Sequence, residues 1–455
     1  MGTDFELISA ICLFVSGALA TSFYAWRVKK AHFTEPIYQF LFFYSLFVLP
    51  LPIRVCITKQ VEGDITEHLP LLIPYMPWAV ALCALGLPFF VWGYYGRLPR
   101  SFAGIIPRPA TGKHSRAAFV LITVIALFLL TILARSAGGL LDFILLGYGG
   151  TSEMFGRGYL AVGFPWLWVA TFFLLYRYSI HKAKADLVLF GVAFGANTLI
   201  AFMMGQRSTL VYFGLAGLLF WHHAIRPFSM KKVAILGAVA FVGLNLVGVV
   251  RGSGFESIPD FWNKLRETSG IVSELPEIYT YTLTNGEFVV PFESLPQMIE
   301  SVGSSVNPQL GATYLKAPLF WIPSALYSGR PLPLANWYMQ EFYGGGLGLN
   351  EGRQFFFLAE GYLNFGTFGV LATMFGWGVF LGTCRRYLQA NDRNAGAILL
   401  YAFAVAFIMR GVAGDFVSMF VGLPEQILSA VVLGLWIACR GKFRLSRQPA
   451  KLSIA

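Results

Sequence analysis

The sequence has few charged residues for its length. Only 13% of its 455 residues are Asp, Glu, Lys or Arg, whereas soluble globular proteins carry about 25%. Apolar residues make up 56%, and the mean hydropathy is +0.63. This shortage of charge excludes an ordinary soluble domain and indicates a polytopic membrane protein. The net charge of +11 does not indicate nucleic-acid binding, because most basic residues lie between apolar runs, as they do in cytoplasmic loops of membrane proteins.

Patterns for metal binding, disulfides and proton transport are also missing. The five cysteines have no CxxC spacing, and the sequence has no DxD motif. Neither a disulfide framework nor a zinc site follows, and we expect no metal and no cofactor. The apolar runs have almost no charge at their centres, where proton-coupled transporters place Asp, Glu or His. No internal repeat of the kind found in transporters is visible.

Eleven apolar runs approach or exceed the roughly 20 residues that are needed to cross a bilayer. They cover 5–25, 36–54, 71–95, 117–135, 159–178, 186–205, 209–225, 232–250, 361–383, 395–410 and 424–439. We therefore predict an all-α polytopic membrane protein with about 11 transmembrane helices. The first run has no basic residue before it and no small-residue cleavage pattern, so we expect a retained anchor and not a signal peptide.

The charges between these runs predict the orientation of the chain. With the N-terminus outside and the C-terminus inside, 22 of the 34 Lys and Arg residues face inward, but only three of the 23 Asp and Glu residues do. Net charge is then about +19 inside and −8 outside, which sums to the +11 of the sequence. An excess of basic residues in short inner loops is the usual sign of the cytoplasmic side.

We predict four segments from this threading. Residues 1–250 hold transmembrane helices 1–8, residues 251–360 form one large outer loop, residues 361–440 hold helices 9–11, and residues 441–455 form a basic inner tail. Short amphipathic stretches recur in the outer loop, at 259–267, 294–302 and 336–343. We expect these to be helices that lie on the outer leaflet or cap a cavity.

Arginines gather at the outer ends of spans and in the outer loop, where few basic residues are expected. The candidates for a site that binds pyrophosphate are Arg207, Arg251, Arg330, Arg353 and Arg410. The planar guanidinium donates two parallel hydrogen bonds to a phosphate and keeps its charge. A helix that starts at Arg207 would add free backbone N–H groups. The alternative is that each arginine reaches toward lipid headgroups or pairs with a loop carboxylate.

Glu360 is the candidate catalytic residue. It opens the ninth predicted span, with Arg353 two turns before it, and a carboxylate there would accept a proton from a sugar hydroxyl. The alternative role is an acid that stabilises a helix N-terminus. Other carboxylates remain rivals, namely Glu293, Glu341, Glu351 and Asp415. Tyr362, Asn364 and Asp415 are candidates for sugar binding.

Three stretches of the sequence resemble Wzy-type oligosaccharide repeat-unit polymerases, the O-antigen polymerases. They are GQRST at 205–209, ATYLKAPLFWIPSALYSGRPLP at 312–333 and AEGYLNFGTFGV at 359–370. The chain length, the span count and the single long outer loop are also similar to that family, over nearly the whole chain.

The resemblance implies a glycosyltransferase of the bacterial inner membrane with a GT-C-like fold. Its donor would be a growing glycan on undecaprenyl pyrophosphate, and its acceptor a single lipid-linked repeat unit. The outer loop would then be periplasmic, and the partners would be these lipid-linked oligosaccharides, membrane lipids and a co-polymerase that regulates chain length.

Two other classes remain open: an O-antigen ligase or another lipid-linked-sugar glycosyltransferase, and a transporter. An O-antigen ligase also uses arginines but relies on an outer-loop histidine, and residues 252–360 contain none. A lipid-linked oligosaccharide flippase or another transporter would need charges across several spans, which the apolar runs lack.

Overall fold

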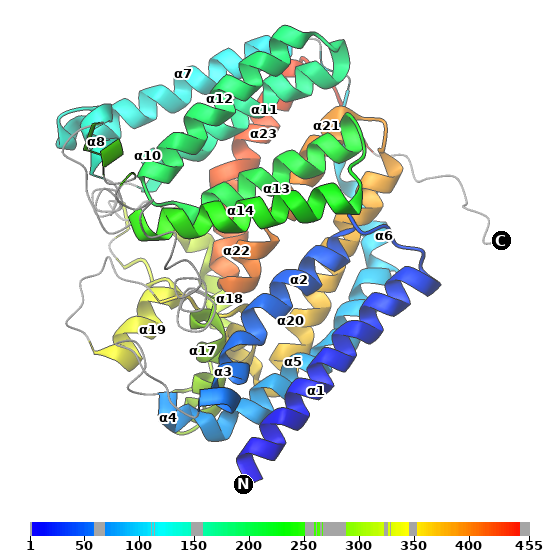
Figure 1. The fold of residues 1–455 in the computed structure, drawn as a ribbon, viewed down its shortest axis with the longest axis vertical. Helices are drawn as coiled ribbons and strands as arrows, with labels where there is room; N and C mark the ends of the chain where they lie inside the picture. The colour runs from blue at the N-terminus through cyan, green and yellow to red at the C-terminus, as the bar shows by residue number, and fades with distance from the viewer. Residues whose placement is uncertain are drawn as a thin grey trace.

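The computed structural model is nearly all helical (Figure 1). It describes residues 2–58, 69–110, 112, 114–146, 158–250, 259–260, 262–263, 266, 288–322, 326–327, 329–344 and 353–445. Within these ranges the strands are β1 (Pro107–Pro109) and β2 (Phe443–Leu445), which pair antiparallel. The predicted all-α class is confirmed.

The chain runs back and forth through helices of very different lengths. The longer α-helices are α1 (Gly2–Phe23), α2 (Pro36–Val48), α5 (Met76–Tyr95), α7 (Ser115–Leu133), α11 (Gly163–His181), α12 (Lys184–Met203), α13 (Arg207–Ala224), α14 (Met230–Val250), α17 (Val290–Ser301), α19 (Leu334–Tyr343), α20 (Phe357–Ala390), α21 (Ala395–Ala406) and α23 (Ser429–Ala438). The shorter ones are α3 (Pro50–Thr58), α4 (Leu69–Leu72), α6 (Leu98–Ile105), α8 (Leu140–Leu145), α10 (Gly158–Ala161), α18 (Ala312–Lys316) and α22 (Ile408–Ala413). In the described part of the chain, the π-helices are η1 (Tyr24–Val28), η7 (Ser418–Gly422) and η8 (Pro424–Leu428), and the 3-10 helices are η2 (Ile73–Tyr75), η3 (Ala134–Ala137) and η6 (Ala317–Trp321).

Nine helices in the described part of the chain are long and apolar enough to cross a membrane. They are Asp4–Val28, Pro36–Ile57, Ile73–Tyr95, Ser115–Leu133, Tyr159–His181, Lys184–Met203, Phe357–Ala390, Ala395–Ala413 and Met419–Ala438. Each overlaps a predicted span. The other two predicted spans, 209–225 and 232–250, form α13 and α14, which are not among the nine. The chain is therefore a multi-pass membrane protein.

The tightest helix pair is α5 against α20, and glycines make its close approach possible. A methyl group at Gly378 would come within 2.1 Å of the Phe90 carbonyl oxygen, and one at Gly382 within 2.4 Å of the Tyr94 carbonyl oxygen. From the other side, a methyl group at Gly93 would come within 2.3 Å of the Phe375 carbonyl oxygen. Small residues four apart let two helix backbones touch, as in other membrane helix pairs.

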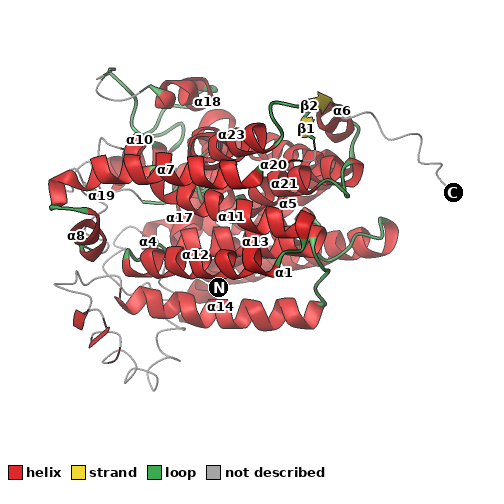
Figure 2. Cartoon of the chain, turned by 90° about the horizontal axis from the view of Figure 1, so that it is seen from above, coloured by secondary structure: helices red, strands yellow, loops and turns green. Residues whose placement is uncertain are grey.

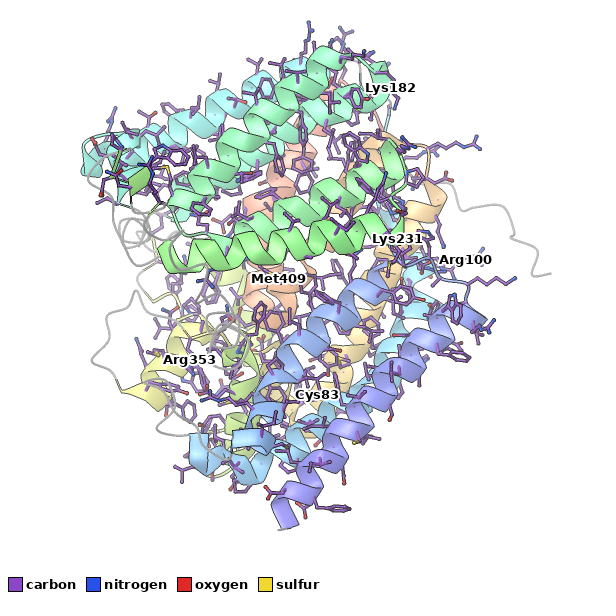
Figure 3. All side chains as sticks on the ribbon, in the orientation of Figure 1. Cys83, Arg100, Lys182, Lys231, Arg353 and Met409 are labelled. Atoms are coloured by element: carbon purple, nitrogen blue, oxygen red, sulfur yellow. The ribbon has the colours of Figure 1, made fainter. Side chains whose placement is uncertain are left out.

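The predicted inner and outer charges lie at opposite ends of the bundle. Figure 1 shows α17, α18 and α19 gathered at one end, and Figure 2 shows α14 and α6 on opposite sides of the bundle. The labelled Arg100, Lys182 and Lys231 lie at the end away from Arg353 (Figure 3). We call the end with Arg353 the loop end and the other the basic end.

Two irregular places interrupt the helices near the loop end. Helix α20 contains non-helical backbone at Phe365 and at Gly366, whose φ of 58° suits glycine. The chain after α22 is extended at Gly414 and then continues through η7 and η8 into α23. π-helical turns are rare and occur often at functional sites.

The outer loop differs from its prediction in one respect. Helices α17 and α19 lie where two of the short helices were expected. In the third stretch, 259–267, the five described residues are helical, and the other four lie outside the described residues. However, α17 is not a surface helix, because Pro291 through Met298 are all buried and α17 lies against α20. The carboxylate of Glu293, which is buried in α17, is compensated by an ion pair with Arg353. The predicted tail 441–455 begins with β2, and its residues from 446 onward lie outside the described residues.

Candidate functional site

Helix α22 contains the most exposed of the predicted arginines that the structure describes. Arg410 is exposed, although Ile408, Gly411, Val412 and Ala413 around it on α22 are buried. Its Nη1 donates a hydrogen bond of 2.9 Å to Gln426 Oε1 on the π-helix η8. Among the described residues, no carboxylate forms an ion pair with Arg410. Its positive charge is therefore open to an anion from outside the chain.

Arg330 approaches the same π-helix from the loop. Its guanidinium carbon lies 5.0 Å from the centre of the Phe320 ring. The Glu425 carboxylate is within electrostatic reach of Arg330. The rings of Trp321 and Phe420 stack with their centres 5.0 Å apart, which holds η6 against η7. Glu425 and Gln426 are consecutive, so one π-helical turn faces both Arg330 and Arg410.

Arg207 begins α13, and that helix touches the start of α22. The Tyr212 ring lies 5.4 Å from the Phe407 ring, and its hydroxyl donates to the Phe403 carbonyl at 2.9 Å. Tyr212 is also the ionisable neighbour of Arg410. Arg207 lies about one and a half turns before Tyr212 on the same helix. No side chain caps the N-terminus of α13, and the Arg207 N–H donates to the Gly205 carbonyl at 3.1 Å, so the N–H groups that follow it in the first turn are the ones open to an anion.

Glu360 lies in a buried polar network and not in an open cleft. The residue is 1% exposed, and its Oε1 accepts a hydrogen bond of 2.7 Å from the Thr313 hydroxyl. Its Oε2 accepts one of 2.5 Å from the Phe416 N–H. The negative charge of Asp415 repels that of Glu360. Both carboxylate oxygens are thus engaged within the chain.

Asn364 and Asp415 extend this network to the loop. Asn364 Nδ2 donates to the Thr313 hydroxyl and to the Glu360 carbonyl, both at 2.8 Å, and Asn364 Oδ1 accepts from the Gly311 N–H at 2.8 Å. Asp415 Oδ2 accepts a 3.2 Å hydrogen bond from the Leu334 N–H. These contacts tie α18 and α19 to the start of α20 and to the turn after α22.

The aromatic residues of this region have different surroundings. Tyr314 contacts the Phe416 ring edge-on at 5.2 Å. Burial, and secondarily the charge of Glu360, raise the pKa of Tyr314, so its hydroxyl stays protonated at pH values where a free tyrosine ionises. Tyr362, predicted to bind sugar, is half-buried and packs against the core.

Arg353 lies apart from the other arginines, in a buried ion pair. Its Nη2 donates to Glu293 Oε2 on α17, and its guanidinium carbon lies 4.5 Å from the centre of the Tyr343 ring. The Tyr338 hydroxyl donates to the other Glu293 oxygen at 3.5 Å. Burial raises the pKa of Glu293, and Arg353 opposes that rise. The geometry supports a structural role for Arg353.

The predicted residues thus separate into groups. Arg330 and Arg410 face one π-helical turn with α13 beside it, Glu360, Asn364 and Asp415 share one network, and Arg353 pairs with Glu293. Of the rival carboxylates, Glu341 is exposed on α19. Arg251 and Glu351 lie outside the described residues.

Sequence reasoning missed Glu425, Gln426 and Thr313. Glu425 and Gln426 begin the last predicted span, and a carboxylate and an amide at that place are a signal that could have found them. Thr313 lies within the ATYLKAPLFW stretch but has no pattern of its own. Its role depends on α18 meeting α20.

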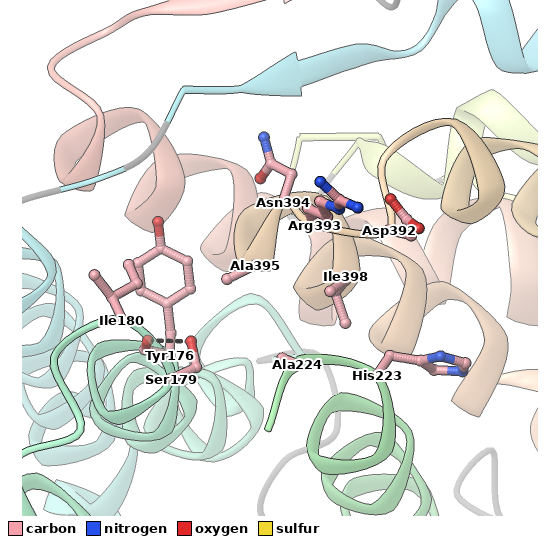
Figure 4. A pocket seen from close by; sticks show the side chains of 10 residues that line it. All are labelled: Tyr176, Ser179, Ile180, His223, Ala224, Asp392, Arg393, Asn394, Ala395 and Ile398. Carbon is pink, nitrogen blue, oxygen red and sulfur yellow. Dashed lines mark hydrogen bonds between the residues drawn. The ribbon is translucent and has the colours of Figure 1, made fainter. Parts of the chain in front are cut away.

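A metal centre or a hollow would be another kind of candidate site. Within the described ranges, no group of three or more His, Cys, Asp or Glu side chains gathers where it would hold a metal ion. A hollow of about 240 Å³ lies instead at the basic end, between α11, α13 and α21 (Figure 4). Its lining includes Tyr176, His223 and Asn394, and none of the predicted site residues.

Comparisons with protein-family models, with curated proteins and with solved structures find no match for this chain.

Proposed function

We propose that this protein is a glycosyltransferase of the bacterial inner membrane that polymerises undecaprenyl-pyrophosphate-linked oligosaccharide repeat units at the periplasmic face. The observation that carries the proposal is Arg410, an exposed residue on a helix whose other residues are buried or half-buried, which forms no ion pair among the described residues. An arginine in that position is suited to an anionic headgroup that arrives in the membrane plane.

The two arginines at η8 match the needs of this reaction. The acceptor hydroxyl oxygen attacks the anomeric carbon of the donor glycan, and the bond from that carbon to the phosphate oxygen breaks. The pyrophosphate leaves with the bonding electron pair, and its developing charge needs neutralising. Arg330 and Arg410 would bind it, with the α13 start as a third contact. Fixed donors aimed at a developing charge typically contribute about 10²–10³-fold each to the rate.

Two carboxylates are candidates to receive the proton of the acceptor hydroxyl. Glu360 is the residue predicted from the sequence, and the Thr313 hydroxyl occupies the position that an acceptor hydroxyl would take. Glu425 is half-buried and lies beside Arg330, next to the residue that binds Arg410. We favour Glu425, because Glu360 already receives hydrogen bonds at both oxygens and is 1% exposed.

The proposal is tested in a strain whose surface polysaccharide depends on this chain. Arg410→Ala and Arg330→Ala should leave only single-repeat products on gels, with normal amounts of protein in the membrane. Lysine at either position should restore little, because it lacks the planar fork. The matched control is Arg135→Ala, which removes an exposed arginine at η3, outside the site, and should leave long chains intact.

The outcomes distinguish the alternatives. Silent lysine variants would mean that the arginines contact only lipid headgroups. Complete loss of attached repeats would support a ligase, and repeats accumulating on the cytoplasmic side would support a flippase.

A second comparison assigns the proton acceptor. Glu425→Gln should lower turnover by about 10²–10⁴-fold without lowering protein levels, which is the usual contribution of a positioned base. Glu360→Gln should lower the amount of folded protein as well, because Glu360 joins three segments. The role of proton acceptor would instead belong to Glu360 if two results were found together. Glu425→Gln would make near-normal long chains, and Glu360→Gln would be folded but inactive.

A further inference from the structure

The basic end carries a cluster of arginines with too few carboxylates. The charged and ionisable groups around the Arg386 guanidinium are Arg385, Arg100, Glu35 and Tyr94. Glu35 is already engaged, because its Oε2 lies 2.6 Å from Arg385 Nε and accepts a 3.3 Å hydrogen bond from the Tyr94 hydroxyl. Among the described residues, the one carboxylate of Glu35 is therefore shared by this cluster of arginines, and neither Arg100 nor Arg386 forms an ion pair of its own.

Arg386 has a further unfilled requirement. Its Nε is buried and has no hydrogen-bond partner in the described part of the chain. A buried guanidinium N–H that lacks an acceptor costs free energy, and acceptor oxygens from an outside ligand would remove that cost. Arg100 is exposed beside it, so the cluster is open to the surroundings.

Helix α6 adds an apolar surface next to these charges. Leu98, Phe102 and Ile105 are 46%, 48% and 66% exposed, and their spacing places them on one helical face. Pro99 and Ala103 on the other face are buried, and α6 contacts α20. Arg100 lies on the opposite, polar side of the same helix, and a short helix with separate apolar and basic sides is typical of the membrane interface.

We propose that Arg100 and Arg386, together with the apolar stripe of α6, bind an anionic phospholipid. The lipid phosphate accepts hydrogen bonds from Arg386 and Arg100, and the acyl chains lie along Leu98, Phe102 and Ile105. Charge complementarity and the adjoining apolar stripe select an anionic lipid over a free phosphate ion. This site is at the opposite end from the arginines of the proposed reaction and does not depend on that function.

The test uses the purified full-length protein in a neutral detergent. Phosphatidylglycerol, phosphatidylcholine or inorganic phosphate is added, and retained lipid is measured by native mass spectrometry. We expect selective retention of phosphatidylglycerol. Arg386→Gln and Arg100→Gln should each reduce it about five-fold, the usual effect of one basic residue near an anionic headgroup. Arg386→Lys should retain more lipid than Arg386→Gln.

Lys231→Gln is the matched control, because Lys231 is an exposed basic residue on α14, at the same end but on the other side of the bundle (Figures 2 and 3). It should retain lipid as the unmodified protein does. If Arg386→Gln fails to fold, the lipid retained by Arg100→Gln decides the test, because Arg100 is exposed and its replacement should not disturb folding. Equal retention of phosphatidylcholine, unchanged retention in the arginine variants, or arginine-dependent stabilisation by inorganic phosphate alone would overturn the proposal.

Discussion

Arg353 and Arg410 are both arginines of the loop end, but their surroundings give them different tasks. Arg353 is enclosed with Glu293 and two tyrosine rings, so its charge is already compensated. Arg410 has an amide partner and is exposed. Replacing Arg353 should therefore change stability, and replacing Arg410 should change ligand binding.

Arg353→Met should destabilise the protein in a pH-dependent way. Removing one partner of a buried ion pair typically costs about 3–5 kcal/mol, because the other charge stays buried alone. Burial already raises the pKa of Glu293, and losing Arg353 raises it further. The folded state then holds the Glu293 proton more tightly than the unfolded state does, so stability falls as pH rises through that window. The thermal unfolding midpoint of the variant should lie closest to the unmodified protein at pH 5 and furthest at pH 8.

The control for this prediction removes the carboxylate too. Adding Glu293→Gln to Arg353→Met should recover part of the midpoint and abolish the difference in its pH dependence. A gap between Arg353→Met and the unmodified protein that stays constant from pH 5 to pH 8 would contradict the explanation.

Residue types were predictable from the sequence, but their partners were not. Arginines at span ends indicated an anion site because such positions are normally poor in arginine. That Arg353 would meet Glu293 depends on α17 entering the core beside α20, and no local pattern encodes that distance. Likewise, the Gln426 that accepts a hydrogen bond from Arg410 lies on the π-helix η8. A hydropathy pattern does not distinguish a π-helix from an α-helix.

At the scale of elements, the contact between α5 and α20 depends on missing side chains. Glycines at Gly93, Gly378 and Gly382 let backbone touch backbone. In lipid, where apolar side chains gain little from leaving the solvent, such close contact is a main source of helix association. The interface should therefore tolerate no added volume.

Gly378→Val should prevent correct packing of the two helices. Even a methyl group there would come within 2.1 Å of the Phe90 carbonyl oxygen, and a backbone atom cannot rotate away. We expect a loss larger than the roughly 1–3 kcal/mol of ordinary overpacking. Size-exclusion chromatography in detergent measures the yield of monodisperse protein. Gly376→Val is the control, because nothing lies within 4 Å of a methyl group there, and it should behave normally.

The spans were predictable because a bilayer imposes length and apolarity on every crossing element. Their interruptions were less so. The stretch AEGYLNFGTFGV contains the kink at Gly366, but its hydropathy does not reveal the kink. The sequence therefore predicts that Glu360 lies at the start of an uninterrupted helix. Helix α13 was predicted as a span, although Arg207, His222 and His223 at its ends lower its hydropathy below that of the nine apolar helices.

At the scale of the whole molecule, the two ends of the bundle differ in their charged residues. Arg100, Lys182 and Lys231 lie together at the basic end, and Arg353 lies at the loop end (Figure 3). The excess of basic residues predicts that the basic end faces the cytoplasm. The arginines of the proposed reaction would then meet substrates on the periplasmic side.

Labelling with a membrane-impermeant maleimide checks this orientation. Ser305→Cys at the loop end should react in cells whose outer membrane alone is permeable, because Ser305 is exposed. Lys231→Cys should react only after the inner membrane is opened. The parent chain controls for the five native cysteines, of which three are buried. The reverse labelling pattern would invert the orientation and contradict the periplasmic site.

The pairing of β1 with β2 has a consequence for biosynthesis. Cys439 Sγ lies 2.8 Å from the Ala110 carbonyl oxygen, and the Ala110 N–H donates to the Lys442 carbonyl at 2.9 Å, so contacts flank the two-stranded sheet. Residues near position 110 emerge from the ribosome long before their partners are translated. The sheet therefore forms only after the span that ends at Ala438 has been translated and inserted. A stop codon before Phe443 would remove β2 while leaving the nine apolar helices in place.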